Sequence, residues 1–505
     1  MSHKIEYEFD FDDQAFYLQN IFAAQSVERN DRSSLSYNPG IRAVGFVPIS
    51  LQSYFARGIF NFQNKYILTA TVRADGSSRF GPGKQFGNFY SVGGNWAIGK
   101  ESFLEDVSWL DALTIRGSHA VMGNDRIPGF QHLAQFAYGN TNPNNSRPNY
   151  YVFGESGAVF NGYRTGVAPN PNVTWETATM QNVAVAFEMF DRRLTGEVNF
   201  YKQKREDILV DNSGVVPDFT GVVLPDENLG RVDSHGVEIT LGWADQIGEV
   251  SYNLGFNLTQ AKNEVIYLPQ PANTPDALRQ EGSQIGSIVV APTDGIFRDQ
   301  AQVDATAVKL AGTVEGEPIY TDTNGDLKID DKDFIRINSS NIPEIQYGFT
   351  GGLNYKNFNF NFLLQGQAKA DMLVFFDQNG AKPEHVFTQR WTPENRNSRY
   401  PRAFGLNDSY SGIQNGNPDN FVGADLWLHD ASFLRLKEIE IGYTLSKEKT
   451  TFADIKFFAR GFNLLTMFSD IQKLGLDPEA TGYNNFRGAT YPSLKMYTFG
   501  LNFTF

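Results

Sequence analysis

The sequence contains no cysteine in 505 residues, which excludes a disulfide framework, a thiolate metal site and a cysteine nucleophile. It also lacks any run of about eighteen apolar residues. Together with a mean hydropathy of −0.36, this excludes a helical membrane protein. The first ten residues contain no apolar stretch that would direct export. We therefore expect an exported protein with this sequence to be missing its front end.

Positive charge and helix-forming composition are also scarce. The 43 lysines and arginines are outnumbered by 57 acidic residues, and the net charge of −14 argues against nucleic acid as a partner. Stretches rich in Ala, Leu, Glu and Lys are rare. Aromatic residues make up 14% of the chain and there are 47 glycines, a mixture that favours strands and turns.

Apolar and polar residues alternate in many segments, which is the period of a strand with one apolar face. In 252–259, for example, Tyr252, Leu254, Phe256 and Leu258 share one face, and polar or small residues occupy the other. This pattern predicts about fourteen strands, with boundaries accurate to a few residues. They lie near 5–10, 54–62, 65–75, 86–98, 110–122, 176–190, 193–208, 229–244, 249–261, 345–355, 358–370, 433–445, 454–463 and 494–505.

The connections between these strands alternate between short and long. Short ones fall at 63–64, 99–109, 191–192, 245–248, 356–357 and 446–453. Long polar ones fall at 11–53, 123–175, 209–228, 262–344, 371–432 and 464–493, and segment 77–83 is the shortest of this second set. Outer-membrane barrels have this pattern, with short periplasmic turns and long external loops, and an even strand count would put both chain ends on the periplasmic side. A soluble β-sandwich is the alternative, although so many long loops on one side are uncommon for it.

The last predicted strand carries an apolar stripe that ends at the final residue, with Tyr497, Phe499, Leu501, Phe503 and Phe505 on one face. Such a strand would invite aggregation at the edge of a soluble sheet. A terminal aromatic strand is typical of outer-membrane barrels, whereas a buried strand of a sandwich is the alternative interpretation.

Several longer motifs resemble the barrel of SusC/RagA-type TonB-dependent transporters. They are YILTATVRADGSSRF at 66–80, FYSVGGNW at 89–96, WLDALTIRGS at 109–118, NLGRVDSHGVEI at 228–239 and FLRLKEI at 433–439. The resemblance runs from about residue 50 to the C-terminus, and ordered motifs of this length are far more specific than shared composition.

The resemblance implies an all-β, antiparallel transmembrane barrel of roughly 22 strands with a plugged lumen, in the outer membrane of Bacteroidetes-type bacteria. It also implies a SusD-like lipoprotein that closes over the external mouth, and transport driven by TonB-ExbB-ExbD through the plug. On this basis residues 1–505 are a single, partial barrel domain. The signal peptide, TonB box, plug and roughly eight strands are expected to be missing, so we expect no transport by the chain alone.

The segment 322–333 is the sharpest local motif. Oxygen donors at Asp322, Asn324, Asp326, Asp330 and Asp333, with the Lys328 carbonyl at the seventh position, resemble a twelve-residue calcium loop. Two departures weaken the match: Leu327 stands at the sixth position in place of glycine, and the last ligand is aspartate rather than glutamate. The alternative is a solvated turn rich in Asp and Asn.

Enzymatic motifs are missing. The fragment at 81–84 lacks the spacing of a phosphate-binding loop, no two of the six histidines have helical zinc spacing, and there is no Gly-x-Ser-x-Gly elbow. The sequence therefore predicts a protein that is not an enzyme and that needs no cofactor other than, at most, calcium.

Aromatic residues of the long segments are candidates for stacking on sugar rings or peptide side chains. We single out Tyr151, Tyr163, Trp391 and Tyr483, with packing among the loops or against the SusD-like partner as the alternative. Trp96 and Trp175 lie near strand ends and are interpreted as anchors at the membrane interface.

The sequence thus predicts outer-membrane uptake of oligosaccharides or peptides, with two alternatives. A passive porin would share the barrel without a plug, and a secreted carbohydrate-binding β-protein would share only the strands. We also expect the sheet to be an incomplete barrel, because strand 5–10 has no upstream neighbour.

Overall fold

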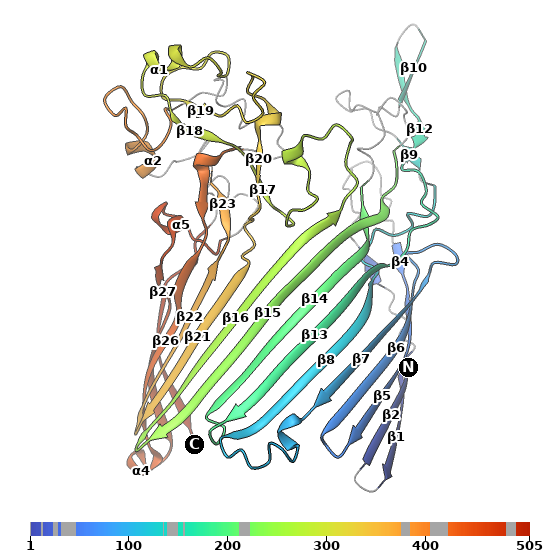
Figure 1. The fold of residues 1–505 in the computed structure, drawn as a ribbon, viewed down its shortest axis with the longest axis vertical. Helices are drawn as coiled ribbons and strands as arrows, with labels where there is room; N and C mark the ends of the chain where they lie inside the picture. Colours follow the sequence, from blue (N-terminus) through green and yellow to red (C-terminus); the bar gives the residue numbers. More distant parts are fainter. Residues whose placement is uncertain are drawn as a thin grey trace.

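The computed structural model describes residues 2–11, 14–23, 29–31, 47–134, 136–138, 150–154, 157–211, 223–374, 384–403, 423–480 and 491–505. Its main feature is one antiparallel sheet of fifteen long, tilted strands, which lie side by side in chain order (Figure 1). The strands are β1 (Ser2–Phe11), β2 (Gln14–Ala23), β5 (Leu51–Phe62), β6 (Tyr66–Ser77), β7 (Phe86–Trp96), β8 (Leu110–Asn124), β13 (Glu176–Met189), β14 (Leu194–Val210), β15 (Glu227–Ile247), β16 (Val250–Tyr267), β21 (Ile345–Tyr355), β22 (Phe358–Ala368), β26 (Phe433–Leu445), β27 (Asp454–Met467) and β28 (Met496–Thr504).

The predicted alternation of apolar and polar residues is confirmed as two distinct faces of the sheet. Residues paired across neighbouring strands share a face. Leu258 pairs with Ile239 and Tyr347 on the apolar face. Asn257 pairs with Thr240 and Gly348 on the polar one. Among the described residues, the apolar face carries many exposed side chains, and Phe499 on β28, for instance, is 79% exposed. A sandwich would bury this face, so the sheet is the wall of a membrane barrel.

Short and long connections lie at opposite ends of the sheet, as predicted. The tight turns at 63–64, 191–192 and 356 contain residues with left-handed backbone, such as Gln63, Asn64 and Lys356, which is the geometry that joins twisted strands most closely. Aromatic rings gather at this end: Tyr66 stacks on Trp96 at 6.3 Å, and Trp109 contacts Phe190 at 6.4 Å. Such a girdle marks a membrane interface and is consistent with the role predicted for Trp96.

Strand β2 lies within 11–53, which the sequence predicts to be one long connection, so that expectation is wrong for residues 14–23. Phe11 pairs with Gln14 in a hairpin, and β2 then pairs with β5. The extra strand makes the count odd. The expectation that both ends lie on the turn side is therefore wrong: β1 starts at the loop end, whereas β28 finishes at the turn end (Figure 1).

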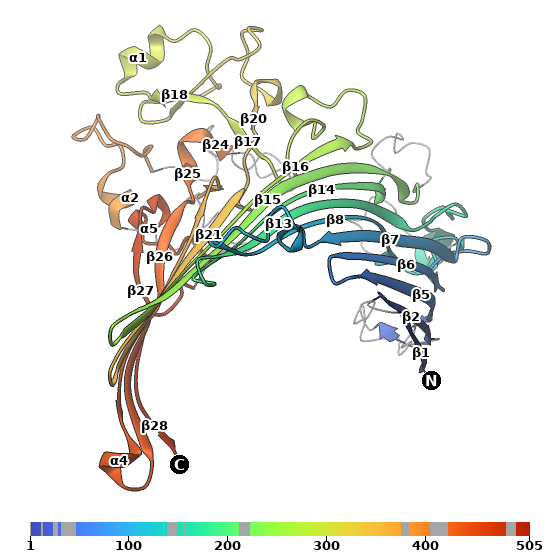
Figure 2. The same cartoon turned by 60° about the horizontal axis from the view of Figure 1, so that its bottom comes forward.

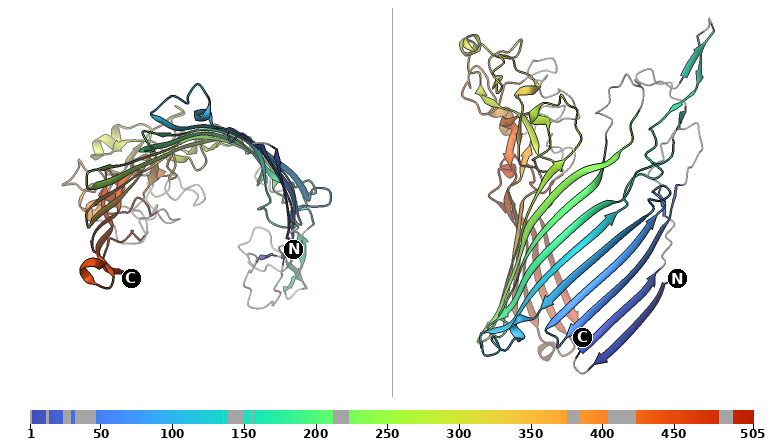
Figure 3. Two further views of the ribbon diagram at one scale, coloured as in Figure 1. Left: turned by 90° about the horizontal axis from the view of Figure 1, so that it is seen from below. Right: turned by 45° about the vertical axis from the view of Figure 1, so that its right-hand side comes forward.

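The sheet is curved but open. Seen from below, the strands form an arc, with the two chain ends at its two sides (Figure 3). Strands β1 and β28 are the two edges of the fifteen-stranded sheet among the described residues. The expectation of an incomplete barrel is therefore confirmed.

The long connections above β16 to β27 fold into a structure of their own, which we call the loop lobe and which comprises residues 268–344, 369–374, 384–403, 423–432 and 468–480. It contains three small sheets, made by β17 (Ile288–Ala291) with β20 (Ile335–Ile337) and β24 (Gly423–Ala424), by β18 (Thr293–Ile296) with β19 (Pro318–Tyr320), and by β23 (Asp371–Leu373) with β25 (Leu428–Asp430). It also contains α1 (Gln300–Ala305), α2 (Glu384–Thr388) and α5 (Asp470–Lys473) (Figure 2). Val290, Val374, Ala424, Trp427 and Ile471 belong to its shared core.

No helix in the described part of the chain is both long and apolar enough to span a membrane.

Candidate functional site

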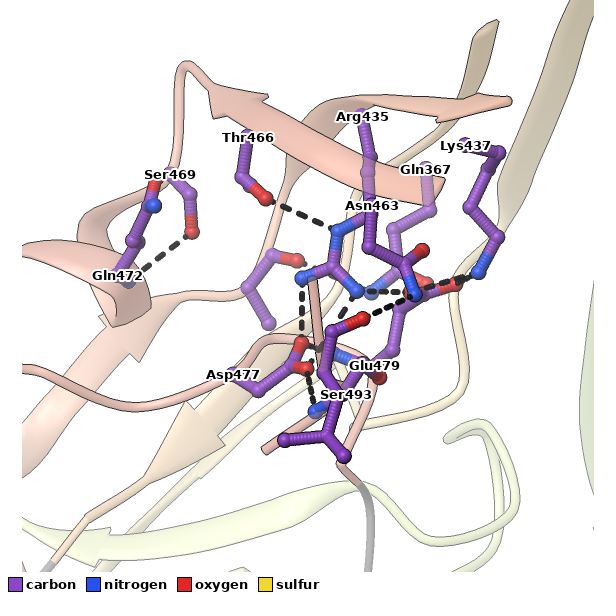
Figure 4. A network of polar contacts seen from close by, with 12 residues as sticks. Gln367, Arg435, Lys437, Asn463, Thr466, Ser469, Gln472, Asp477, Glu479 and Ser493 are labelled. Atoms are coloured by element: carbon purple, nitrogen blue, oxygen red, sulfur yellow. Dashed lines mark hydrogen bonds and ion pairs between the residues drawn. The ribbon is translucent and has the colours of Figure 1, made fainter. Parts of the chain in front are cut away.

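The polar face of the wall carries an ion-pair network where β26 meets the loop lobe, and the central pair of this network is almost fully buried (Figure 4). Arg435 Nη2 lies 2.5 Å from Asp477 Oδ1, and the exposed fractions of the two side chains are 5% and 4%. The guanidinium also contacts Glu479 and donates from Nε to Thr466 Oγ1 at 2.9 Å. Lys437 Nζ lies 2.9 Å from the Glu479 carboxylate. This network, which we call the Arg435 cluster, fastens segment 477–479 to the wall.

Asp477 is held in its charged form. Burial by itself raises the pKa of this carboxyl group, but the hydrogen bonds from Arg435 and from the backbone N–H groups of Glu479 and Ser493 outweigh it, so the pKa lies below its ordinary value. Ser493 N donates to Asp477 Oδ2 at 2.7 Å. One carboxylate therefore ties together β26, the segment after α5 and the chain just before β28.

A β-bulge decides which side chains of β26 belong to this face. The register of β26 against β27 shifts between Leu436 and Glu438. Residues 435 and 440 would lie on opposite faces of a regular strand, because their separation is odd. The extra residue at the bulge brings both Arg435 and Glu440 onto the polar face.

Glu440 is the centre of a second network on the same face. Its carboxylate accepts hydrogen bonds from Lys456 Nζ at 2.7 Å, from Arg460 Nε at 2.8 Å and from Asn359 Nδ2 at 3.2 Å. Arg460 Nε also lies 3.2 Å from Glu438. Charged side chains thus lie side by side on β26 and β27, with the neutral Asn359 on β22 beside them, which suits a water-facing surface and would be costly against lipid.

The polar face of β6 to β14 is open and less crowded. A hollow of about 360 Å³ is lined by Thr69, Gly93, Asn95, Arg116 and Glu197, among others. Arg116 and Glu197 form an ion pair of 2.5 Å across its floor, and both side chains are nearly half exposed. Glycine at position 93 adds no side chain to this row, so the wall here offers donors and acceptors to water or to a hydrophilic solute.

The segment 322–333 forms a compact turn whose oxygens are used by its own backbone. Asp322 accepts from the N–H groups of Gly325 and Leu327 at 2.7 and 2.9 Å. Asp333 is buried and accepts from Thr323 N and Asp330 N at 2.9 and 2.8 Å. Asn324 and Asp326 likewise accept backbone N–H groups.

The donors of this segment therefore do not form a ready calcium cage. Each carboxylate oxygen of Asp333 already accepts one backbone N–H group. Lys328 Nζ lies 2.6 Å from Asp330, where a cation would compete with it. In the described residues, no three His, Asp or Glu side chains converge closely enough to hold a metal ion. Calcium at this loop remains a prediction that requires the loop to rearrange.

The predicted ligand-stacking aromatics have different surroundings. Tyr151 on β10 (Tyr150–Phe153) and Tyr163 on β12 (Tyr163–Thr165) are 57% and 68% exposed. Trp391 is only 7% exposed and donates to the Arg298 carbonyl at 3.3 Å, so its ring packs inside the loop lobe. Tyr483 lies outside the described residues. A ligand role for these four residues remains a prediction.

Trp175 does not lie at a membrane interface, and that interpretation is wrong. Its ring is buried with Phe80 and Phe89, at 5.1 and 5.4 Å between centroids, and its Nε1 donates to the Gln85 carbonyl. It is part of a small core under the loop end of β7 and β13.

The Arg435 cluster is the feature that the sequence reasoning missed. The motif at 433–439 carries the family resemblance, and its two basic residues within a predicted strand are a usable signal for such a cluster. Their acidic partners, Asp477 and Glu479, come from a segment assigned to a loop, and nothing in the sequence pairs them.

Comparisons with known proteins agree with this geometry. The family model described as "TonB dependent receptor-like, beta-barrel" matches residues 2–371. The chain belongs to this TonB-dependent receptor β-barrel family. It is therefore an outer-membrane protein, as the resemblance implied, and not a secreted carbohydrate-binding protein.

The relatives are named as TonB-dependent receptors, and one of them is SusC, as the resemblance implies. The chain is 28% identical to TonB-dependent receptor P26 of Formosa agariphila, over 94% of this chain and 48% of that protein. It is 26% identical to TonB-dependent receptor SusC of Bacteroides thetaiotaomicron, over 90% of this chain and 45% of that protein. The RagAB peptide transporter structure superposes with a TM-score of 0.71 at 21% identity, over 100% of this chain and 55% of that one, which shows the shared fold.

The chain thus spans about half the length of the curated relatives that it matches. Those relatives are named as receptors and not as enzymes.

Proposed function

We propose that this chain forms the C-terminal wall and the external loop lobe of an outer-membrane importer for oligosaccharides or peptides. The observation that carries the proposal is the pair of opposite faces: an uncovered apolar face for lipid, and a polar face with fixed ion pairs that suits a water-filled or plug-filled lumen. Family membership supports the same conclusion.

The loop lobe supports a docking role for the external end. Its core joins three connections that are far apart in sequence, and the Arg435 cluster fastens the third of them to the wall. A folded surface of this kind suits a SusD-like lipoprotein that closes over the mouth. We propose that energy arrives from TonB-ExbB-ExbD through a plug, and that residues 1–505 do not transport alone because their sheet is open.

A growth assay tests the proposal. A strain deleted for the gene would be grown on single oligosaccharides and on single peptides as the carbon source, with and without a plasmid copy. We expect loss of growth on one ligand class, restored by the plasmid, and no restoration in a strain that lacks TonB. Unchanged growth on every member of both panels would contradict the proposal.

Conductance distinguishes the passive porin. The protein purified from outer membranes would be placed in planar lipid bilayers. A plugged importer is expected to show no steady ion current, because the plug fills the lumen. A constant open current that does not depend on TonB would favour the porin instead.

A further inference from the structure

A row of basic side chains stands where the apolar face of the wall ends. Phe200 on β14 pairs with Val237 on β15 in the last apolar row, and the Phe200 ring is 53% exposed. In the next row, Lys202 pairs with His235, and His235 pairs with Lys262 on β16. Because paired residues share a face, three basic side chains lie next to one another on three neighbouring strands.

The two lysines of the row lie on either side of His235. Directly opposite side chains in a sheet have Cβ atoms only about 5 Å apart, so Lys202, His235 and Lys262 can all reach one small anion. Lys202 and Lys262 are exposed, and neither forms an ion pair with any residue that the structure describes. The two ammonium groups are therefore available to an anion from outside the sheet.

The row after it is mixed. Lys204 pairs with Asp233, and Asp233 pairs with Glu264. The two carboxylates lie on the loop side of the basic row and repel any anion that approaches from the loops. An anion that approaches from the membrane side meets no such charge, because Phe200, Val237 and Val183 continue the apolar face there.

The position of the row indicates what anion it meets. Strand β14 begins at the turn end with Leu194 and runs toward the loops, so Lys202 lies on the external side of the apolar residues. A cation just beyond the apolar band stands at the depth of lipid headgroups. The membrane holds the phosphates of outer-leaflet lipids at this depth, whereas a free anion would have to come from solution.

We propose that Lys202, His235 and Lys262 bind the phosphate group of an anionic lipid of the outer leaflet. The two ammonium groups and an imidazole N–H donate to the phosphate oxygens, and the acyl chains lie along Phe200 and Val237. The inference depends on the outer-membrane location and not on transport.

Native mass spectrometry of the detergent-purified protein tests the proposal. The probe is lipid A that carries phosphate, and the matched lipid is the same molecule after enzymatic removal of phosphate. Lys202→Gln combined with Lys262→Gln is expected to reduce the lipid-bound fraction at least five-fold. Lys447→Gln combined with Lys449→Gln, which removes two charges on α4 (Lys447–Thr450) at the turn end, is expected to leave it unchanged.

Three results would overturn the assignment: unchanged binding by the Lys202/Lys262 variant, equal binding of the dephosphorylated lipid, or displacement of the lipid by millimolar inorganic phosphate. The last result would mean that phosphate without lipid is sufficient. Lys202→Arg with Lys262→Arg controls for misfolding, because it keeps the charge and is expected to retain binding.

Discussion

Arg435 and Asp477 form an ion pair that is almost completely shielded from water. Removing one partner of such a pair leaves an uncompensated charge and costs about 3–5 kcal/mol, whereas an exposed pair contributes roughly 0–1 kcal/mol. Arg435→Gln is therefore expected to release segment 469–480 from the wall. Hydrogen–deuterium exchange would show faster exchange there, with Lys473→Gln, which breaks only an exposed pair with Asp470, as the control. Equal protection in both variants would contradict this role.

The same pair predicts a pH dependence with a defined sign. The pKa of Asp477 in the folded protein is lowered, so this carboxylate stabilises the fold above its unfolded pKa of about 3.9. The contribution is lost as the pH falls through the lower folded value. The protection of segment 469–480, taken relative to the intrinsic exchange rate at each pH, is expected to be constant from neutral pH to about pH 5 and to fall below about pH 4. Asp477→Asn should abolish this dependence; a loss of protection that begins near neutral pH would mean that another group is responsible.

Substitutions of Asp333 and of Asp326 distinguish a structural role from a metal-binding role for the acidic loop. Asp333 is buried and accepts two backbone N–H groups, whereas Asp326 is exposed. Leaving buried donors unsatisfied costs about 1–3 kcal/mol each. Asp333→Ala is therefore expected to speed exchange across 322–333 in calcium-free buffer, and Asp326→Ala is expected to change it little. Equal effects would contradict the assigned difference.

Calcium itself is tested by calorimetric titration of the chelated protein. Heat at or below millimolar calcium that disappears in the Asp326→Ala variant would support the calcium loop. If no heat is measured up to millimolar calcium, the segment is a turn held by its own hydrogen bonds.

Strand β28 shows at the level of one element how the two faces differ. Phe499 lies on the apolar face, whereas the adjacent Thr498 pairs with Arg460 on the polar one. A lysine against lipid at the bilayer midplane costs about 2–4 kcal/mol, whereas a lumen-facing lysine meets water. Phe499→Lys is therefore expected to lower the fraction of folded, membrane-inserted protein, measured by heat-dependent gel mobility, and Thr498→Lys is expected to be tolerated. A larger effect of Thr498→Lys would reverse the assignment of the faces.

The elements that the sequence predicted correctly are those with long, regular alternation, such as β16 and β21. The alternation pattern does not predict strand β2, because Phe16, Tyr17 and Leu18 are consecutive apolar residues that break the period of two. The β26 bulge could not be found either, since an inserted residue is visible only against the partner strand.

At the scale of the whole molecule, the absence of native cysteine allows a clean test of the open sheet. Lys456 and Asn502 are paired on β27 and β28, so Lys456→Cys with Asn502→Cys is expected to form a disulfide under mild oxidation. Ile5→Cys with Asn502→Cys is expected to form none, because β1 and β28 lie at opposite edges. Efficient cross-linking of the second pair within one chain would show that the sheet closes.

The sequence by itself determined that the chain forms an antiparallel sheet with one apolar and one polar face, because strand periodicity and the alternation of turn and loop lengths are local properties of the chain. It also carried the family motifs and the apolar stripe of the last strand. Only the tertiary structure decided which charges meet on the polar face, where Arg435 pairs with Asp477, 42 residues further along the chain. It also decided that Trp391 and Trp175 are buried. Those outcomes depend on packing between segments far apart in sequence, and no local pattern records such contacts.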